Sequence, residues 1–278
     1  MDKALPREEY IEQAYLFAAL GDRLAKNEPV QRLLGHIKHE LLATTKLPMA
    51  IDYLLAELNH SGSMSEAMRN MPHYFTAFQS YLMWQAEDER ARMDMLMVMT
   101  LLEHESKFRA ESSDAVPLFF FQLEILCRNR LSYDDGLKAM ADDPVYNEAW
   151  REWLLDARKK LGFVDIADLI YVHSQYYVDV EKDVEKHPET VLFGPREGRI
   201  ALANRRKDPL YLFAALQRQL NYPEVPRPKK ADPNEELLPR LVRTMEQLQT
   251  RIKLLEDEQR EKGIDLSQFY PEPGKRPE

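Results

Sequence analysis

The chain has 278 residues, a net charge of −9 and only 9 glycines. This length suits one large or two small domains, and the low glycine content with many helix-forming residues favours an all-α fold. The acidic balance argues against a nucleic-acid-binding surface across the whole chain, so we expect no nucleic-acid partner.

The single cysteine, Cys127, excludes an internal disulfide and suits a reducing compartment. No apolar run approaches the ~18 residues of a membrane-spanning helix, and the first residues lack the apolar stretch of a signal peptide. We therefore expect a cytoplasmic protein without a transmembrane segment.

Residues 1–110 are predicted to form a bundle of six helices. Apolar residues recur every three or four positions in the first helix, which ends near Ala25, and Pro29 begins the second. The third begins near Pro48. The fifth follows Pro72, and the sixth spans residues 93–109 with one side expected to face the core, carrying Met93, Leu96, Met97, Thr100 and Leu101.

A short segment, residues 61–68, separates the third helix from the fourth. Gly62 predicts the end of a helix. Ser63 and Glu66 match a Ser-x-x-Glu capping box, which predicts a new helix that continues to Asn70. We interpret this segment as the hinge between the two halves of the N-terminal bundle.

A second helical subdomain is predicted over residues 115–222, after a polar boundary at residues 111–114. Ser132 is expected to cap one of its helices, and Pro144 to open another. Residues 192–198 are predicted to form a loop.

The C-terminal region differs in kind from the rest. Residues 223–237 form a proline-rich linker, residues 238–262 a coiled-coil helix and residues 263–278 a tail. Apolar residues in the helix alternate in steps of three and four over about three heptads, which predicts self-association into a homo-oligomer. The alternative is an amphipathic helix that packs on its own domain. The predicted seam consists of Leu241, Met245, Leu248, Ile252 and Leu255.

Four motifs of the N-terminal region occur in a recognisable order: residues 24–30, Gly62 to Met68, Pro72 to Phe75, and Ala86-Glu87. In this order and spacing the chain resembles the cytoplasmic helical domain of the type II secretion F-protein family, which includes the platform proteins of type IV pili. The resemblance implies tandem helical domains and partners in a secretion or pilus machinery. The membrane-spanning helices of that family are missing, so it implies a soluble relative.

Metal binding is the main alternative function. Ferritin-like bundles need two Glu-x-x-His pairs and two further glutamates directed into one core. The sequence offers one such pair, Glu57 and His60. A solvated polar face explains the same residue types equally, and the question is whether these side chains converge on one point: His36, Glu40, Glu57, His60 and Glu103.

No motif in the sequence predicts catalysis. Cys127 would need a nearby histidine to act as a nucleophile, and a buried structural cysteine is the simpler interpretation. The glycine-rich fingerprints of common nucleotide sites do not occur. We therefore expect no catalytic residues, no cofactor and no metal, and a protein that is not an enzyme.

One basic cluster is a candidate for binding a protein partner, either as phosphate-clamping arginines or as exposed charge alone. It consists of Arg196, Arg199, Arg205, Arg206 and Lys207. A run of alternating methionines, Met93 to Met99, is either an adaptable surface or core packing. Together these features predict a non-enzymatic scaffold that binds other proteins.

Overall fold

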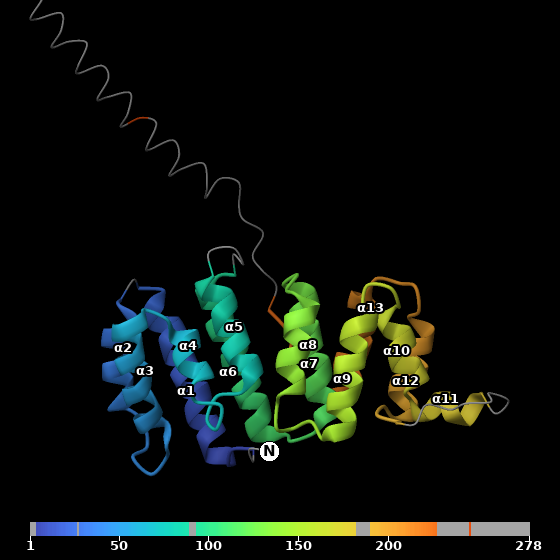
Figure 1. Cartoon of the computed structure of the whole chain (residues 1–278), viewed down its shortest axis with the longest axis horizontal. Helices are drawn as coiled ribbons and strands as arrows, with labels where there is room; N and C mark the ends of the chain where they lie inside the picture. Colours follow the sequence, from blue (N-terminus) through green and yellow to red (C-terminus); the bar gives the residue numbers. More distant parts are fainter. Residues whose placement is uncertain (1–3, 27, 89–92, 182–189, 227–244, 246–278) are drawn as a thin grey trace, which may run out of the picture. The chain divides into compact units, whose positions relative to one another are not determined.

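The computed structural model describes residues 4–26, 28–88, 93–181, 190–226 and 245. Within these ranges the chain forms thirteen α-helices and no β-strand, which confirms the expected all-α multi-helix fold (Figure 1). The chain divides into two compact units, Met1–Pro228 and Lys229–Glu278. All thirteen helices belong to the first unit.

Six helices cover the N-terminal 110 residues, as predicted, and seven follow. Their bounds are α1 (Arg7–Leu24), α2 (Val30–Lys38), α3 (Leu47–Ser61), α4 (Met64–Arg69), α5 (Ala77–Glu87), α6 (Met95–Glu111), α7 (Ala115–Arg128), α8 (Tyr133–Ala141), α9 (Glu148–Lys160), α10 (Ile166–Val172), α11 (Gln175–Val180), α12 (Pro195–Ala203) and α13 (Pro209–Leu220).

Helices α1 and α6 run antiparallel at the centre of the N-terminal half (Figure 1). At one end the Arg7 Nε donates a hydrogen bond of 3.1 Å to the Ala110 carbonyl. At the other end Gly21 lies so close to Met99 that a β-carbon on it would approach the Met99 Cβ to 3.3 Å. Helix α2 packs on α1, α3 packs on α2, and α4 packs on α3. Helix α5 packs on α4 and α6.

The C-terminal half of the first unit continues the same core. Helix α8 packs on α9 and also on α5, while α13 covers α7. Phe193, from the segment before α12, is fully buried among aromatic side chains, with its ring centroid 5.2 Å from that of Trp153. One continuous cluster of buried apolar residues therefore runs through both halves. The predicted division near residues 111–114 stays a prediction.

The segment at residues 61–68 ends one helix and begins the next, as predicted. Gly62 has a φ of 76°, which suits glycine because a β-carbon is unfavourable there. The Ser63 side chain accepts a hydrogen bond of 3.2 Å from the Glu66 backbone N–H. The second half of the predicted capping box is wrong: the Ser63 N–H donates to the Ser61 hydroxyl at 3.2 Å and not to Glu66. The Glu87 carboxylate accepts from the next donor, the Met64 N–H, at 2.5 Å.

Three expectations about local structure are wrong. Helix α5 begins at Ala77, later than predicted, because Thr76 and Gln79 form a reciprocal capping box there. Residues 192–198 are not all loop: Pro195 is the first residue of α12, a position where its missing N–H costs no hydrogen bond. In α6 the predicted inward face is wrong for Leu96, which is 37% exposed, whereas Leu101 is buried and Met93 and Met97 pack against the core as predicted.

The predicted linker, coiled-coil helix and tail fall almost entirely outside the described residues. Of the linker, residues 223–226 are described, and Val225 is buried. Of the predicted seam, Met245 alone is described; it is helical and 60% exposed. Leu241, Leu248, Ile252 and Leu255 lie outside the described ranges.

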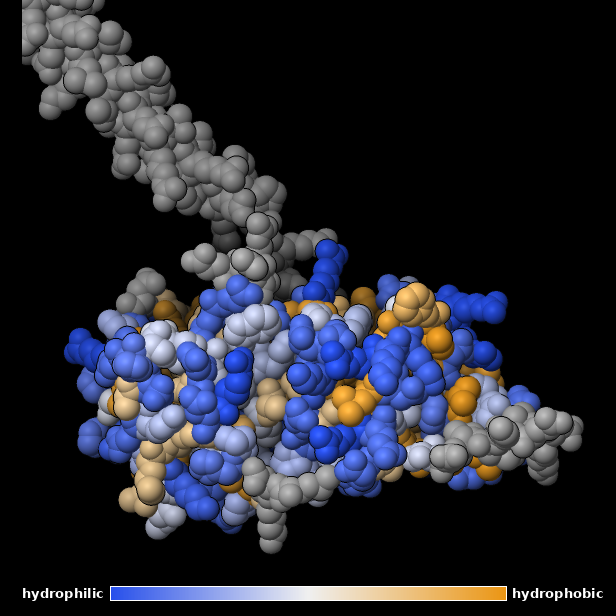
Figure 2. All heavy atoms as spheres, in the orientation of Figure 1, coloured by the Kyte–Doolittle hydropathy of each residue, from blue (hydrophilic) through white to orange (hydrophobic). Residues whose placement is uncertain are grey.

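Among the described helices, none has both the length and the apolar character needed to cross a lipid bilayer. Hydrophilic residues cover most of the face in Figure 2, with apolar patches between them. The most exposed large apolar side chains include Phe163 and Met49, at 94% and 74%. Apolar side chains that are exposed singly are common on protein surfaces.

Candidate functional site: a groove between α5 and α8

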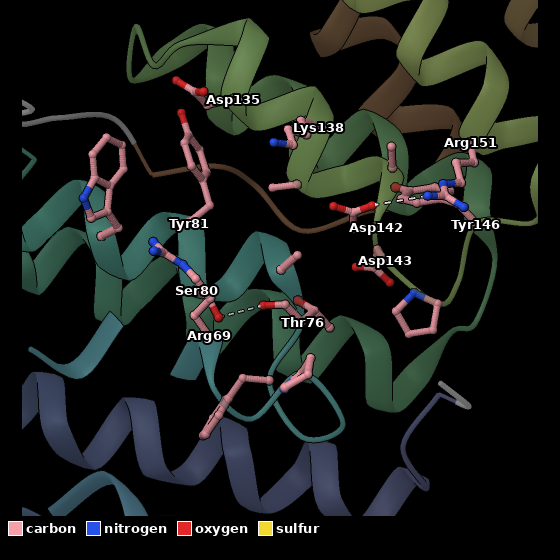
Figure 3. A pocket seen from close by; sticks show the side chains of 17 residues that line it. Arg69, Thr76, Ser80, Tyr81, Asp135, Lys138, Asp142, Asp143, Tyr146 and Arg151 are labelled. Atoms are coloured by element: carbon pink, nitrogen blue, oxygen red, sulfur yellow. Dashed lines mark hydrogen bonds and ion pairs between the residues drawn. The ribbon is translucent and has the colours of Figure 1, made fainter. Parts of the chain in front are cut away.

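A cavity of about 760 Å³ lies between α4–α5 on one side and α8 with the α8–α9 loop on the other (Figure 3). This volume falls within the ~300–1,000 Å³ range of typical ligand sites. We call it the groove. Its lining consists of Arg69, Pro72, Phe75, Thr76, Ala77, Ser80, Tyr81, Trp84, Asp135, Lys138, Ala139, Ala141, Asp142, Asp143, Pro144, Tyr146 and Arg151.

The floor of the groove is mostly apolar, with Ala77, Ala139 and Pro144 among its partly exposed residues and Phe75 buried beneath it. Two hydroxyls at the floor are already bound to backbone: Thr76 accepts from the Gln79 N–H at 3.2 Å, and Ser80 donates to the Thr76 carbonyl at 3.1 Å. An occupant would therefore meet apolar surface there and would gain mainly by burying its own apolar side chains.

Tyr81 crosses the groove from α5 toward α8. Its hydroxyl donates to the Ser132 carbonyl at the start of α8 over 3.2 Å. Burial, with a smaller contribution from the negative charge of Asp135, raises the pKa of the Tyr81 phenol. The phenol is therefore a neutral hydrogen-bond donor at physiological pH. One turn later on α5, Trp84 is 36% exposed and its ring lies 6.4 Å from that of Tyr81.

The inner wall of the groove is held by a buried ionic network. Arg109, from α6, donates to the Asp143 carboxylate through Nη1 at 3.2 Å and to Glu105 through Nη2 at 3.0 Å. Burial alone would lower the pKa of Arg109, but the Asp143 and Glu105 carboxylates raise it well above its ordinary value. Gln122 extends the network, since it donates to Glu105 at 2.9 Å and accepts from the Tyr146 hydroxyl at 2.7 Å. Asp143 is thus held from inside by a cation that it shares with Glu105.

The rim of the groove carries the charges that an occupant would meet. Arg69 projects from α4 and Lys138 from α8, on opposite walls, and among the described residues neither has a carboxylate within 4.0 Å (Figure 3). Arg151 and Asp142 form a loose pair of 3.9 Å in which each side chain is about half exposed, at 44% and 50%. Asp135 is exposed at the Tyr81 end.

The predicted basic cluster lies on a different part of the first unit, and all five of its residues are exposed. Arg205 forms an ion pair with Asp168, and its guanidinium lies 5.4 Å from the Tyr171 ring centroid. Arg206 donates its backbone N–H to Asp165, and Arg199 stacks over Tyr176. Arg199, Arg205 and the backbone of Arg206 therefore have partners within the fold.

Of the two remaining residues of the basic cluster, Lys207 also has a contact within the fold. The Lys207 ammonium donates to the Ala203 carbonyl at the end of α12, over 2.6 Å. Arg196 lies in the first turn of α12. Of the alternating methionines, Met99 is buried and Met93, Met95 and Met97 pack against the core partly exposed. Core packing explains this run.

Cys127 is half buried at the end of α7. Burial raises the pKa of its thiol, against a smaller lowering by a hydrogen bond with Tyr133. A raised pKa reduces the thiolate fraction at neutral pH, which is the opposite of what activates a cysteine nucleophile.

Two glutamates of the metal alternative, Glu40 and Glu103, form ion pairs with other residues. Glu40 binds the Arg23 guanidinium at 2.6 Å and accepts from the Tyr15 hydroxyl at 2.6 Å. In the described part of the chain, no group of three or more His, Cys, Asp and Glu side chains is placed to hold a metal ion.

Sequence reasoning missed the groove. Its two free cations are 69 positions apart in the numbering, Arg69 and Lys138, and no local motif connects them. The one local signal was the pair Tyr81 and Trp84, which places two large aromatic side chains one turn apart on the same side of α5.

The chain matches no protein-family model, no curated protein and no solved structure among those compared with it.

Proposed function

We propose that the protein is a non-enzymatic scaffold that binds a segment of another protein in the groove. The observation that carries this proposal is the groove itself, which combines an apolar floor with charges at its rim. Segments of partner proteins bind in such grooves by placing apolar side chains on the floor, while rim charges select the partner.

The nature of the groove supports binding over chemistry. Its buried hydroxyls are engaged with backbone groups, and its one buried carboxylate, Asp143, is bound by Arg109. A catalytic acid or base needs a free proton site that faces the substrate. The exposed groups that remain, such as Lys138, suit recognition.

The resemblance to the secretion F-protein family suggests which partners to test first. On this proposal the chain works in the cytoplasm beside a type II secretion or type IV pilus-like machinery, as a helical module that docks to one of its components. Co-purification from the native host tests this part of the proposal. Recovery of secretion or pilus components is expected, and their absence from a stable complex would remove the assignment to that machinery.

The heptad pattern at residues 238–262 supports a further part of the proposal, self-association. We expect the full chain to form an oligomer and a truncated chain of residues 1–228 to be a monomer, because the truncation removes the seam and keeps the whole first unit. Light scattering coupled to size exclusion measures both masses. Equal monomeric masses would exclude an oligomer formed through the C-terminal helix.

Peptide display against the full chain tests the binding function. Selected peptides are expected to bind the wild type in calorimetry and to lose at least about tenfold in affinity for Ala139→Trp, which fills the groove. The control is Ala203→Trp, an exposed position on α12 outside the groove lining, which should bind as the wild type does. Failure to select any peptide, or equal binding to both variants, would contradict the proposal.

A further inference from the structure

The charges that an occupant of the groove would meet are three cations and two carboxylates, because the third carboxylate of the lining, Asp143, is buried. Asp143 is bound by Arg109 from inside, and Asp142 lies 3.9 Å from Arg151. Asp142 is thereby compensated, and Asp143 is buried and shares the Arg109 cation with Glu105. What remains at the rim is Arg69 and Lys138 on opposite walls, against one exposed carboxylate, Asp135.

The carboxylates near Arg69 and Lys138 in the sequence bind other groups. Asp134, four positions before Lys138, binds Arg158 instead, with its Oδ2 2.6 Å from the Arg158 Nη2. Glu87, at the end of α5, is engaged by the α4 N-terminus through the Met64 and Ser65 N–H groups. Within the described ranges no carboxylate lies within 4.0 Å of the Arg69 or Lys138 cation, although the Asp134 charge acts on Lys138 from a longer distance. Both cations can therefore form an ion pair with an anionic occupant.

We propose that the groove selects partner segments in which acidic residues flank apolar or aromatic ones. This inference rests on the proposed function. The apolar side chains of the segment would pack on Trp84 and Ala139, which reach the surface of the groove, and its carboxylates would bind Arg69 from one wall and Lys138 from the other. Arginine can bind a carboxylate through two parallel hydrogen bonds, which fixes orientation as well as charge.

The net charge of the chain opposes the binding of acidic segments. At −9, the protein attracts basic segments and repels acidic ones at long range. A preference for acidic segments would therefore have to come from charges close to the binding site. Because Arg69 and Lys138 are exposed, the preference should weaken as salt screens them.

Two synthetic peptide pools test the inference. Both contain peptides of about 12 residues, enough for three helical turns, with the same Leu and Phe positions. One pool carries Glu at the remaining variable positions and the other carries Lys. Binding to the full chain is measured by fluorescence anisotropy of the labelled peptides, at low and at physiological salt.

The wild type is expected to bind the Glu pool at least about tenfold more tightly than the Lys pool. The double variant Arg69→Glu with Lys138→Glu should reverse this preference. The matched control is Lys159→Glu with Arg199→Glu, which makes the same change of net charge at exposed positions outside the groove lining, and it should keep the wild-type preference. Circular dichroism confirms that each variant is folded.

The outcomes separate this inference from the proposed function. If both pools bind equally, or the Lys pool binds better, the acidic preference is wrong while a groove that binds peptides stands. If the control variant reverses the preference as well, overall charge and not the groove decides, which also overturns the inference. If the pools bind the wild type but Ala139→Trp leaves binding unchanged, the groove is the wrong site and the proposed function fails with it.

Discussion

At the scale of single residues, one carboxylate connects α5 to the N-terminus of α4. Glu87, at the end of α5, accepts hydrogen bonds from the Met64 and Ser65 N–H groups and from the Ser63 hydroxyl, at 2.5, 3.0 and 2.8 Å. The two N–H groups belong to the first turn of α4, where backbone donors have no partner within the helix. The helix dipole adds to the attraction. Glu87 thereby fastens a helix of only six residues to α5.

Glu87→Gln is expected to lower the free energy of unfolding by about 1.5–3 kcal/mol, because hydrogen bonds to a charged acceptor are replaced by weaker ones. Chemical denaturation of the two proteins measures the difference. Glu66→Gln is the control, since Glu66 is exposed in the same helix, and it should change stability by less than about 0.5 kcal/mol. Equal effects of the two substitutions would show that Glu87 does not hold α4.

At the scale of elements, the glycines of two helices have opposite roles. Gly35 in α2 has open space around its α-carbon, with nothing within 4 Å of where a β-carbon would be. On Gly136 in α8, a β-carbon would lie 2.5 Å from the Leu126 Cδ2 of α7. Leu126 is fully buried, so a shift of its side chain would disturb the packed core around it. Gly136 thus allows α7 and α8 to pack closely, whereas Gly35 does not serve packing.

Gly35→Ala is expected to stabilise the protein by about 0.5–1 kcal/mol, because alanine loses less backbone entropy in a helix. Gly136→Ala should destabilise it by about 1–2 kcal/mol, because the clash with Leu126 outweighs the same gain in helix propensity. Thermal or chemical unfolding of both variants gives the two signs. A stabilised Gly136→Ala protein would mean that α7 and α8 are not in such close contact.

Most elements of the N-terminal half could be predicted from the sequence because their limits are set by local chemistry. Pro29, Gly62 and Ser63 act on backbone groups a few residues away, so their effect is visible in the sequence. The start of α5 was missed because Tyr74 and Phe75 are buried at helical spacing from Phe78 while lying in a turn. Burial alone does not distinguish a turn packed on the core from a helix.

The groove could not be predicted, for a different physical reason. Its walls belong to α4–α5 and α8, and their approach depends on contacts between side chains distant in sequence, such as the Tyr81 hydroxyl and the Ser132 carbonyl. Charge alone did not identify the site either: the basic run at residues 205–207 is conspicuous in the sequence, yet Arg205 and the Arg206 backbone are engaged within the fold. The two free cations, Arg69 and Lys138, do not belong to any basic run in the sequence.

At the scale of the whole first unit, a buried ionic network joins the two halves. Arg109 and Glu105 come from α6, Asp143 from the α8–α9 loop, Gln122 from α7 and Tyr146 from the segment before α9. Arg109 is only 2% exposed at its side chain, and the two carboxylates are fully buried. Removal of the cation would leave two carboxylates buried without compensation.

Arg109→Met is therefore expected to lower the free energy of unfolding by about 3–5 kcal/mol, the usual cost of breaking a buried pair by removing one partner. The control is Lys38→Met, which breaks an exposed pair with Asp52 and should cost at most about 1 kcal/mol. Denaturation of the two variants compares the costs. A small effect of Arg109→Met would mean that the network does not hold the halves together.

The central claim is that the groove between α5 and α8 binds a segment of a partner protein. Deuterium exchange of the full chain, with and without the tightest peptide obtained by display, tests it most directly. We predict slower exchange in α4, α5, α8 and the α8–α9 loop, and no change in α2 or α12, which lie outside the groove lining. Protection confined to other helices, or no protection under saturating peptide, would contradict the claim.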